Sequence, residues 1–230
     1  CGCVCGTSCG SPIRDLRINV TTRGNFRYKY CIPAEIFGPL YPFLPKSQIL
    51  TFEEITRLAK IFSFLGTLKL RITGGEPLLR RDLHLLVKML CELEGYEDIA
   101  LTTNGYLLSK YAKELFDSGL KRITVILDSL KETTFKYMNG GVSSVQDVAK
   151  GIESAIGAGL YVKINVVVQK GVNEDQIIPI AEYGHKLGIN TRSIDFMDVG
   201  NHNKWIEEKV FLARDILTVL KSKFSIDAGD

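Results

Sequence analysis

Apolar and polar positions along the chain switch between short runs with a period of two and longer runs with helical spacing. The short runs predict six strands, at residues 16–20, 69–73, 99–103, 122–127, 162–168 and 192–196. Amphipathic segments separate consecutive strands and predict five intervening helices. Strands and helices that alternate in this way are typical of an α/β fold, either a parallel β/α barrel or a doubly wound sheet. Periodicity alone leaves both architectures open.

Several predicted helices have recognisable ends. Thr51 and Glu54 have the spacing of a capping box at a helix start. Gly66, Gly119 and Gly159 stand where helices at residues 52–65, 107–118 and 144–158 should end. We also expect Asn173 to cap a helix that begins near residue 174.

Three of the strands carry a cation on the face opposite their apolar side chains. The period of two places Arg17 with Asn19, Arg71 with Lys69, and Lys163 with Asn165. If the apolar faces pack on helices, these cations point into the barrel, where each needs an anionic partner. Asp128 and Asp195 are the nearest acids that the pattern offers, and Arg192 joins the set. A polyphosphate ligand is one explanation, and charges that simply extend into solvent are the other.

Composition and charge exclude several classes of binding partner. The 230 residues are 45% hydrophobic and 24% charged, with a net charge of +3. This excess is too small to predict binding to nucleic acid or to an anionic membrane. No apolar run approaches the length of a membrane-spanning helix, and the N-terminus has no secretory signal pattern. We therefore expect a cytoplasmic protein without nucleic-acid or membrane partners.

Two polar, glycine-containing segments follow consecutive strands. They are Thr73-Gly-Gly-Glu-Pro77 and Thr102-Thr-Asn-Gly105. Ligands bind at the carboxyl ends of parallel strands, where glycines let a backbone approach closely and Glu76 offers a carboxylate to an amine. Either segment alone could be a sharp turn, but two in series favour a site.

These segments carry a family resemblance. The sequence resembles the molybdenum cofactor biosynthesis protein A (MoaA) family of radical S-adenosylmethionine (SAM) enzymes, the GTP 3′,8-cyclases, in register from about Pro12 to about Trp205. The residues that carry the resemblance include Tyr30-Cys-Ile-Pro33, Leu50-Thr-Phe-Glu-Glu54, Arg71-Ile-Thr-Gly-Gly-Glu-Pro-Leu78, Leu101-Thr-Thr-Asn-Gly105 and Phe196-Met-Asp-Val-Gly-Asn201. The set is far more specific than its Gly-Gly-Glu-Pro motif alone.

The resemblance implies a partial (β/α)6 TIM-like barrel that binds a [4Fe-4S] cluster and SAM. In the family, a 5′-deoxyadenosyl radical converts GTP to 3′,8-cyclo-7,8-dihydro-GTP. The resemblance implies SAM-binding positions at Tyr30, Gly75, Glu76 and Met197, a cluster ligand at Cys31, and GTP-binding positions at Arg17, Arg71, Thr102 and Lys163. The sequence identifies no electron donor.

The sequence also departs from the family. Gly24 and Tyr28 stand where the family has the other two cysteine ligands of the cluster, and Thr22 and Ile126 replace an acid and a serine. The family continues beyond the position of Asp230 with a segment that holds a second cluster, and we expect that segment to be missing. The expected domains are therefore a Cys-rich tail, residues 1–11, and a radical SAM partial barrel, residues 12–230.

These departures leave three hypotheses. The first is an enzyme of the cyclase family, impaired by the lost ligands at 24 and 28. The second is a catalytically inactive barrel that retains partial nucleotide binding, with an uncovered side at which two chains could form a homodimer. The third assigns thiol or metal chemistry to the tail cysteines, Cys1, Cys3, Cys5 and Cys9.

Overall fold

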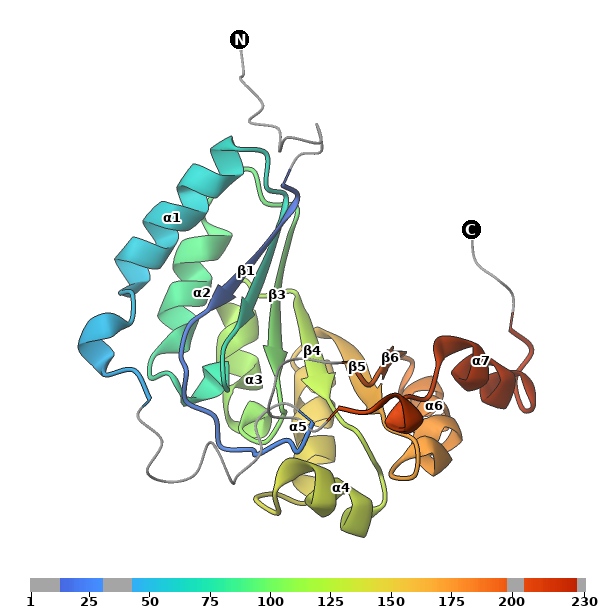
Figure 1. Cartoon of the computed structure of the whole chain (residues 1–230). Coiled ribbons are helices and arrows are strands. Elements are labelled where there is room, and N and C mark those ends of the chain that lie inside the picture. Colours follow the sequence, from blue (N-terminus) through green and yellow to red (C-terminus); the bar gives the residue numbers. More distant parts are fainter. Residues whose placement is uncertain (1–12, 31–42, 198–204, 227–230) are drawn as a thin grey trace. The chain divides into compact units, whose positions relative to one another are not determined.

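The computed structural model describes residues 13–30, 43–197 and 205–226, and it contains the six strands that the pattern predicts (Figure 1). They are β1 (Asp15–Asn19), β2 (Lys69–Thr73), β3 (Asp98–Thr103), β4 (Arg122–Ile126), β5 (Tyr161–Val168) and β6 (Asn190–Asp195). Every predicted strand is found, with boundaries that differ by no more than two residues. The tail, residues 1–11, lies outside the described residues.

The order of the strands decides between the two architectures that periodicity leaves open. The strands form one sheet in the order β1-β2-β3-β4-β5-β6. β1 pairs parallel with β2, β2 with β3, and β5 with β6. A doubly wound sheet reverses its order at a switch point, whereas a barrel adds each strand beside the last. The α/β class and the partial (β/α)6 barrel are therefore confirmed.

The helices between strands match the prediction except between β4 and β5, where two helices replace the expected one, and a further helix follows β6, where none was predicted. The helices are α1 (Phe52–Phe64), α2 (Leu83–Cys91), α3 (Leu108–Asp117), α4 (Glu132–Asn139), α5 (Val145–Gly157), α6 (Ile177–Leu187) and α7 (Ala213–Lys221). Short 3-10 turns lie at η1 (Lys46–Gln48), η2 (Pro77–Leu79), η3 (Glu174–Gln176) and η4 (Glu207–Lys209). No described helix has the length and apolar character needed to cross a membrane.

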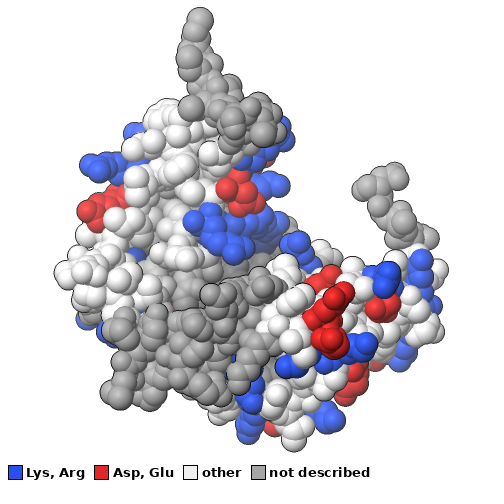
Figure 2. Space-filling model, in the orientation of Figure 1, with Lys and Arg blue, Asp and Glu red and all other residues white. Residues whose placement is uncertain are grey.

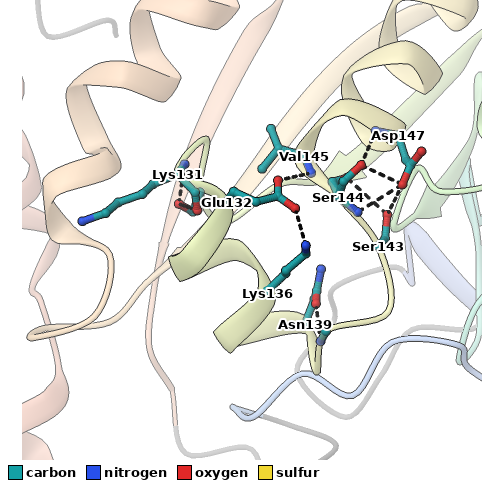
Figure 3. Close-up of polar contacts among 10 residues, drawn as sticks. Lys131, Glu132, Lys136, Asn139, Ser143, Ser144, Val145 and Asp147 are labelled. Atoms are coloured by element: carbon teal, nitrogen blue, oxygen red, sulfur yellow. Dashed lines mark hydrogen bonds and ion pairs between the residues drawn. The ribbon is translucent and has the colours of Figure 1, made fainter.

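The unexpected helix α4 is joined to α5 by polar contacts (Figure 3). The Glu132 carboxylate accepts hydrogen bonds from the backbone N–H of Val145 at 3.0 Å and from Lys136 Nζ at 3.0 Å. Ser144 and Asp147 cap α5 reciprocally, because Asp147 Oδ2 accepts from Ser144 N at 3.1 Å and Ser144 Oγ accepts from Asp147 N at 3.2 Å. These local bonds stabilise a short helix whose apolar pattern is weak.

The chain divides into two compact units, each described separately below. The first contains residues 13–25, 43–124 and 150–162, and the second contains residues 26–30, 125–149, 163–197 and 205–226.

The first unit has one apolar and one polar sheet face. Leu70 and Ile72 of β2 are fully buried, while Lys69 is exposed and Arg71 half-buried. Helices α1, α2 and α3 all lie on the same side of β1, β2 and β3 (Figure 1). Burying each aliphatic side chain against such helices contributes about 2 kcal/mol. The alternation predicted from sequence is therefore confirmed for β2.

The structure confirms most of the predicted helix ends but not all of them. Thr51 and Glu54 form the predicted capping box, and Gly66, Gly119 and Gly159 all have positive φ angles. Asn173 occupies the predicted N-cap position, before η3, but its side chain makes no capping hydrogen bond. Its Nδ2 donates instead to the carbonyl oxygens of Asp128 (2.7 Å) and Val167 (2.9 Å), since the buried strand ends compete for it.

Candidate functional site

The polar face of β1 and β2 brings two of the predicted GTP-binding residues together. Arg17 and Arg71 are register partners on adjacent parallel strands. Asp15 and Lys69 are register partners two residues earlier in the same strands, on the same face of the sheet. In-register residues point to the same side of a sheet. We call the side that carries Arg17, Lys69 and Arg71 the cation face. Lys and Arg side chains gather there beside acidic ones (Figure 2).

Arg71 already has acidic partners. Its Nη2 lies 3.5 Å from Asp15 Oδ2, and its Nη1 lies 3.6 Å from Asp98 Oδ2. Asp98 also forms a close ion pair with Arg122 of β4. The expectation that Asp128 and Asp195 are the nearest acids was wrong for Arg71. The strands begin one residue earlier than predicted, and that extra residue is the acid in both β1 and β3.

The other predicted GTP-binding residues differ in their surroundings. Arg17 is exposed and has no ion-pair or hydrogen-bond partner among the described residues. Thr102 is half-buried near the carboxyl end of β3. In the second unit, Lys163 is half-buried on the polar side of β5, and Arg192 of β6 is exposed. Their roles in binding remain predictions.

The segment after β2 is packed against the loop that follows β1. Gly75 N donates to Thr21 O at 2.8 Å, and Glu76 N donates to Arg23 O at 2.7 Å. A Cβ atom on Gly75 would lie 2.2 Å from Arg23 O. Glycine is therefore required at 75 by a close approach of two backbone segments, in addition to any ligand that binds there.

The Glu76 carboxylate joins the ends of β2 and β3. The side chain is buried, and it accepts hydrogen bonds from Leu78 N (3.0 Å), Thr103 Oγ1 (2.7 Å) and Asn104 N (2.8 Å). Burial raises the pKa of Glu76, and the three hydrogen bonds oppose that rise. The Glu76 carboxylate, which was expected to contact an amine, therefore holds the ends of β2 and β3 together through hydrogen bonds within the protein.

Asn104 extends this network to the loop after β1. Its Nδ2 donates to Asn25 Oδ1 at 2.7 Å. Asn25 Nδ2 is buried and has no hydrogen-bond partner among the described residues. A buried donor without an acceptor is costly, so a polar ligand group at this strand end would stabilise it.

The second unit has a buried carboxyl group at the end of β4. Asp128 Oδ2 accepts from the Tyr30 hydroxyl at 2.9 Å, and Oδ1 accepts from Val167 N at 2.8 Å. Burial raises the pKa of Asp128 to about 7, while these two hydrogen bonds act in the opposite direction. Met197, two residues beyond β6, is mostly exposed. Tyr30 and Met197 keep their predicted SAM role as a hypothesis.

Sequence reasoning missed Asp15, Asp98 and Asn104 as site residues, and it named Asp128 only as a possible partner of the inward cations. Asn104 lies within the second motif and could have been found there. Asp15 and Asp98 lie at the first positions of their strands, and no spacing rule separates such acids from ordinary surface carboxylates.

The segment that precedes Cys31 is packed with aromatic rings. The ring centroid of Tyr28 lies 5.6 Å from that of Phe26 and 5.1 Å from that of Tyr30, and Phe26 packs edge-on against Phe135 at 6.3 Å. All four side chains are buried. Cys31 itself lies outside the described residues.

Comparisons with known proteins assign the family. A model of the Radical SAM superfamily matches residues 18–184. The chain belongs to the radical SAM superfamily. Relatives named GTP 3′,8-cyclase from Staphylococcus aureus, including strains Mu3 / ATCC 700698 and JH9, are 50% identical over 218 residues. The matched region covers 95% of this chain, and the chain spans 64% of the length of these curated relatives.

Solved structures share the radical SAM fold at lower identity. SuiB of Streptococcus suis bound to S-adenosylmethionine superposes with a TM-score of 0.76 at 20% identity, covering 92% of this chain and 48% of that chain. Methylornithine synthase (PylB) superposes with a TM-score of 0.68 at 15% identity, covering 91% and 62%. At these identities the likeness shows the fold.

The superfamily implies a [4Fe-4S] cluster and SAM, and the described residues fit the two groups differently. A cluster of this kind is held by thiolates. Gly24 has no side chain, and Tyr28 is buried between Phe26 and Tyr30. The described residues contain no group of three His, Cys, Asp or Glu that could hold a metal. The residues at positions 24 and 28 therefore do not fit a cluster. The unsatisfied Asn25 Nδ2 at the strand ends does fit a polar group such as the carboxylate of SAM.

Proposed function

We propose that this chain is a GTP 3′,8-cyclase-type protein of molybdenum cofactor biosynthesis whose retained activity is binding of GTP on the cation face. The observation that carries this proposal is the in-register pair of Arg17 and Arg71. Two guanidinium groups on adjacent strands offer several donors to neighbouring phosphate oxygens. The 50% identity to proteins named GTP 3′,8-cyclase supports GTP as the nucleotide triphosphate.

Arg17 is the stronger phosphate ligand of the pair. It is exposed and has no partner among the described residues, so it loses no ion pair when phosphate binds. Thr102 adds a hydroxyl near the end of β3. Lys163 is assigned to GTP from the family resemblance alone.

The test is isothermal titration calorimetry of the purified chain with GTP and with GMP. We expect GTP to bind more tightly than GMP, because the cation face recognises phosphate charge. Arg17→Ala should weaken GTP binding by about tenfold or more, the loss typical of a charge-assisted phosphate contact. Arg57→Ala on the exposed side of α1 is the matched control and should change nothing. Equal effects of the two variants would contradict the proposal.

SAM is the proposed second ligand, held at the carboxyl ends of β2 and β3. Asn25 Nδ2 is the buried donor that it would satisfy, while Gly75 and Glu76 shape the adjoining backbone. Equilibrium dialysis with labelled SAM should show binding to the wild-type chain and a clear loss in Asn25→Ala. Circular dichroism at matched concentration verifies that the variant is folded. Unchanged SAM retention by a folded variant would remove Asn25 from the site.

The cyclase reaction itself is a second candidate, favoured by the 50% identity. The residues at positions 24 and 28 support the cyclase reaction less well than GTP binding, because neither Gly24 nor Tyr28 supplies a thiolate to a cluster. Iron and sulfide analysis after anaerobic reconstitution, followed by product assay with GTP, SAM and a reductant, separates the candidates. Cyclised GTP with a stoichiometric cluster would favour the enzyme, and GTP binding without either would favour the binding protein.

A further inference from the structure

Two carboxylates surround the guanidinium group of Arg71 on the cation face. Asp15 lies at 3.5 Å from one terminal nitrogen and Asp98 at 3.6 Å from the other. The Arg71 and Asp98 side chains are 28% and 22% exposed, so solvent screens this pair less than a fully exposed one. Arg71 is therefore occupied by the protein's own anions before a ligand arrives.

The two acids have other cations beside them. Asp98 forms its close ion pair with Arg122. Lys69 is the in-register neighbour of Asp15 on one side and of Asp98 on the other. If Arg71 turned from the two acids to a phosphate group, each acid would keep a neighbouring cation. This exchange avoids leaving a half-buried carboxylate without compensation.

Arg17 lies in a different environment one strand away. Its register partner is Arg71, and it has no acidic partner among the described residues. The two arginines of the face thus differ, because Arg17 has no acidic partner among the described residues and Arg71 has two. Their contributions to phosphate binding should differ accordingly.

We propose that Asp98, assisted by Asp15, selects ligands of the cation face by charge, because its carboxylate is the internal counter-anion that a phosphate group must displace from Arg71. This inference rests on the proposed binding of GTP. Any ligand that binds Arg71 must first displace Asp98, and only a ligand with several phosphates gains enough from Arg17 and Arg71 together to offset that cost. Asp98 is a specificity-determining residue of the site and takes no part in chemistry.

Neutralising Asp98 should therefore strengthen anion binding. Asp98→Asn keeps the shape of the side chain and removes its charge, and we expect GTP to bind about fivefold more tightly, the effect of removing one like charge near a partly exposed site. The affinity for GMP should rise by at least the same factor, because GMP gains too little to displace Asp98 in the wild-type chain. The preference for GTP over GMP should therefore fall, and both gains should shrink as salt rises. Asp15→Asn, at a more exposed position, should act in the same direction to a smaller extent.

The experiment is calorimetry of GTP and GMP binding to the wild-type chain, Asp98→Asn, Asp15→Asn and a control, at low and high salt. Asp117→Asn is the control, because its exposed carboxylate pairs with Lys113 on α3 and the substitution changes the net charge equally. Thermal unfolding of each variant verifies its fold. Tighter GTP binding in Asp98→Asn and Asp15→Asn, but not in the control, supports the inference.

Other outcomes overturn specific statements. Weaker GTP binding in folded Asp98→Asn would mean that the carboxylate orients Arg71, and unchanged binding would mean that it does not compete; either overturns the inference while the proposed function stands. An equal gain in Asp117→Asn would assign the effect to net charge and also overturn it. Absence of GTP binding to the wild-type chain and to every variant would overturn the proposed function and this inference together.

Discussion

The buried carboxyl group of Asp128 gives a stability test whose size follows from the structure. Its pKa is raised from the ordinary 3.8 to about 7 because the group is buried and receives only two hydrogen bonds on its carboxylate oxygens, from Val167 and Tyr30. Between these two pKa values the folded chain holds a proton that the unfolded chain has released. Stability linked to Asp128 is therefore present at low pH and is lost as the pH rises from 4 through 7.

The magnitude follows from the shift at about 1.4 kcal/mol per pKa unit. Linkage over the two titrations predicts that the free energy of unfolding falls by about 2–3 kcal/mol between pH 5 and pH 8 on account of this group. Asp128→Asn has nearly the same shape, can accept from Val167 N–H, and cannot ionise. The difference in stability between the variant and the wild-type chain should therefore shift by this amount in favour of the variant.

The assay is urea unfolding followed by circular dichroism at pH 5, 6, 7 and 8. Comparing each variant with wild type at every pH cancels the contributions of all ionisable groups that the two proteins share. Asp117→Asn, an exposed carboxylate on α3, should run parallel to wild type. A constant difference between Asp128→Asn and wild type across this range would refute the reasoning, because it would mean that Asp128 titrates near its ordinary value.

Three further predictions concern the loop after β1 and its neighbours. Gly75→Ala should lower the free energy of unfolding by about 2 kcal/mol or more, because its Cβ would meet a backbone carbonyl at 2.2 Å, whereas Gly157→Ala has open space and should be neutral in the same urea titration. Glu76→Gln should cost about 1–3 kcal/mol, since its NH2 group would face buried donors, and an equally stable variant would contradict the network. The double change Gly24→Cys with Tyr28→Cys should raise iron content after anaerobic reconstitution toward four per chain; iron equal to wild type would show that thiolates are not what the loop lacks.

The strands and their polar faces could be predicted because each depends on local alternation. β2 is found at the predicted residues, with Leu70 and Ile72 buried and Arg71 on the opposite face. The barrel architecture could not be predicted from local patterns, because the order of the strands depends on pairing between distant segments. The expectation of a barrel came from the family resemblance.

The charge balance of the site could not be predicted for a related reason. A boundary error of one residue removed Asp15 and Asp98 from the predicted strands, and with them the acids that pair with Arg71. Strand ends are weakly specified by sequence, because a polar residue fits a strand terminus and a loop equally well. An anionic ligand that binds Arg71 therefore has to compete with the carboxylates of Asp15 and Asp98.

The roles of Glu76 and Asn173 depended on contacts between strand ends. The Glu76 carboxylate was expected to contact an amine of a ligand, and the structure shows it buried and bonded to Leu78, Thr103 and Asn104. Asn173 has the sequence context of a helix cap, but its side chain donates to the carbonyl oxygens of Val167 in β5 and of Asp128, two residues beyond β4. In both cases tertiary donors and acceptors outcompete the local partner that sequence suggests.

The central claim is that the cation face binds GTP without a bound cluster. Its most direct test is calorimetric titration of GTP into chelator-treated, iron-free protein and into protein reconstituted with iron and sulfide, each with Arg17→Ala alongside. We expect equal GTP affinity in the two wild-type preparations and weaker binding in both preparations of Arg17→Ala. Binding that appears only after reconstitution, or that is unchanged by Arg17→Ala, would contradict the claim.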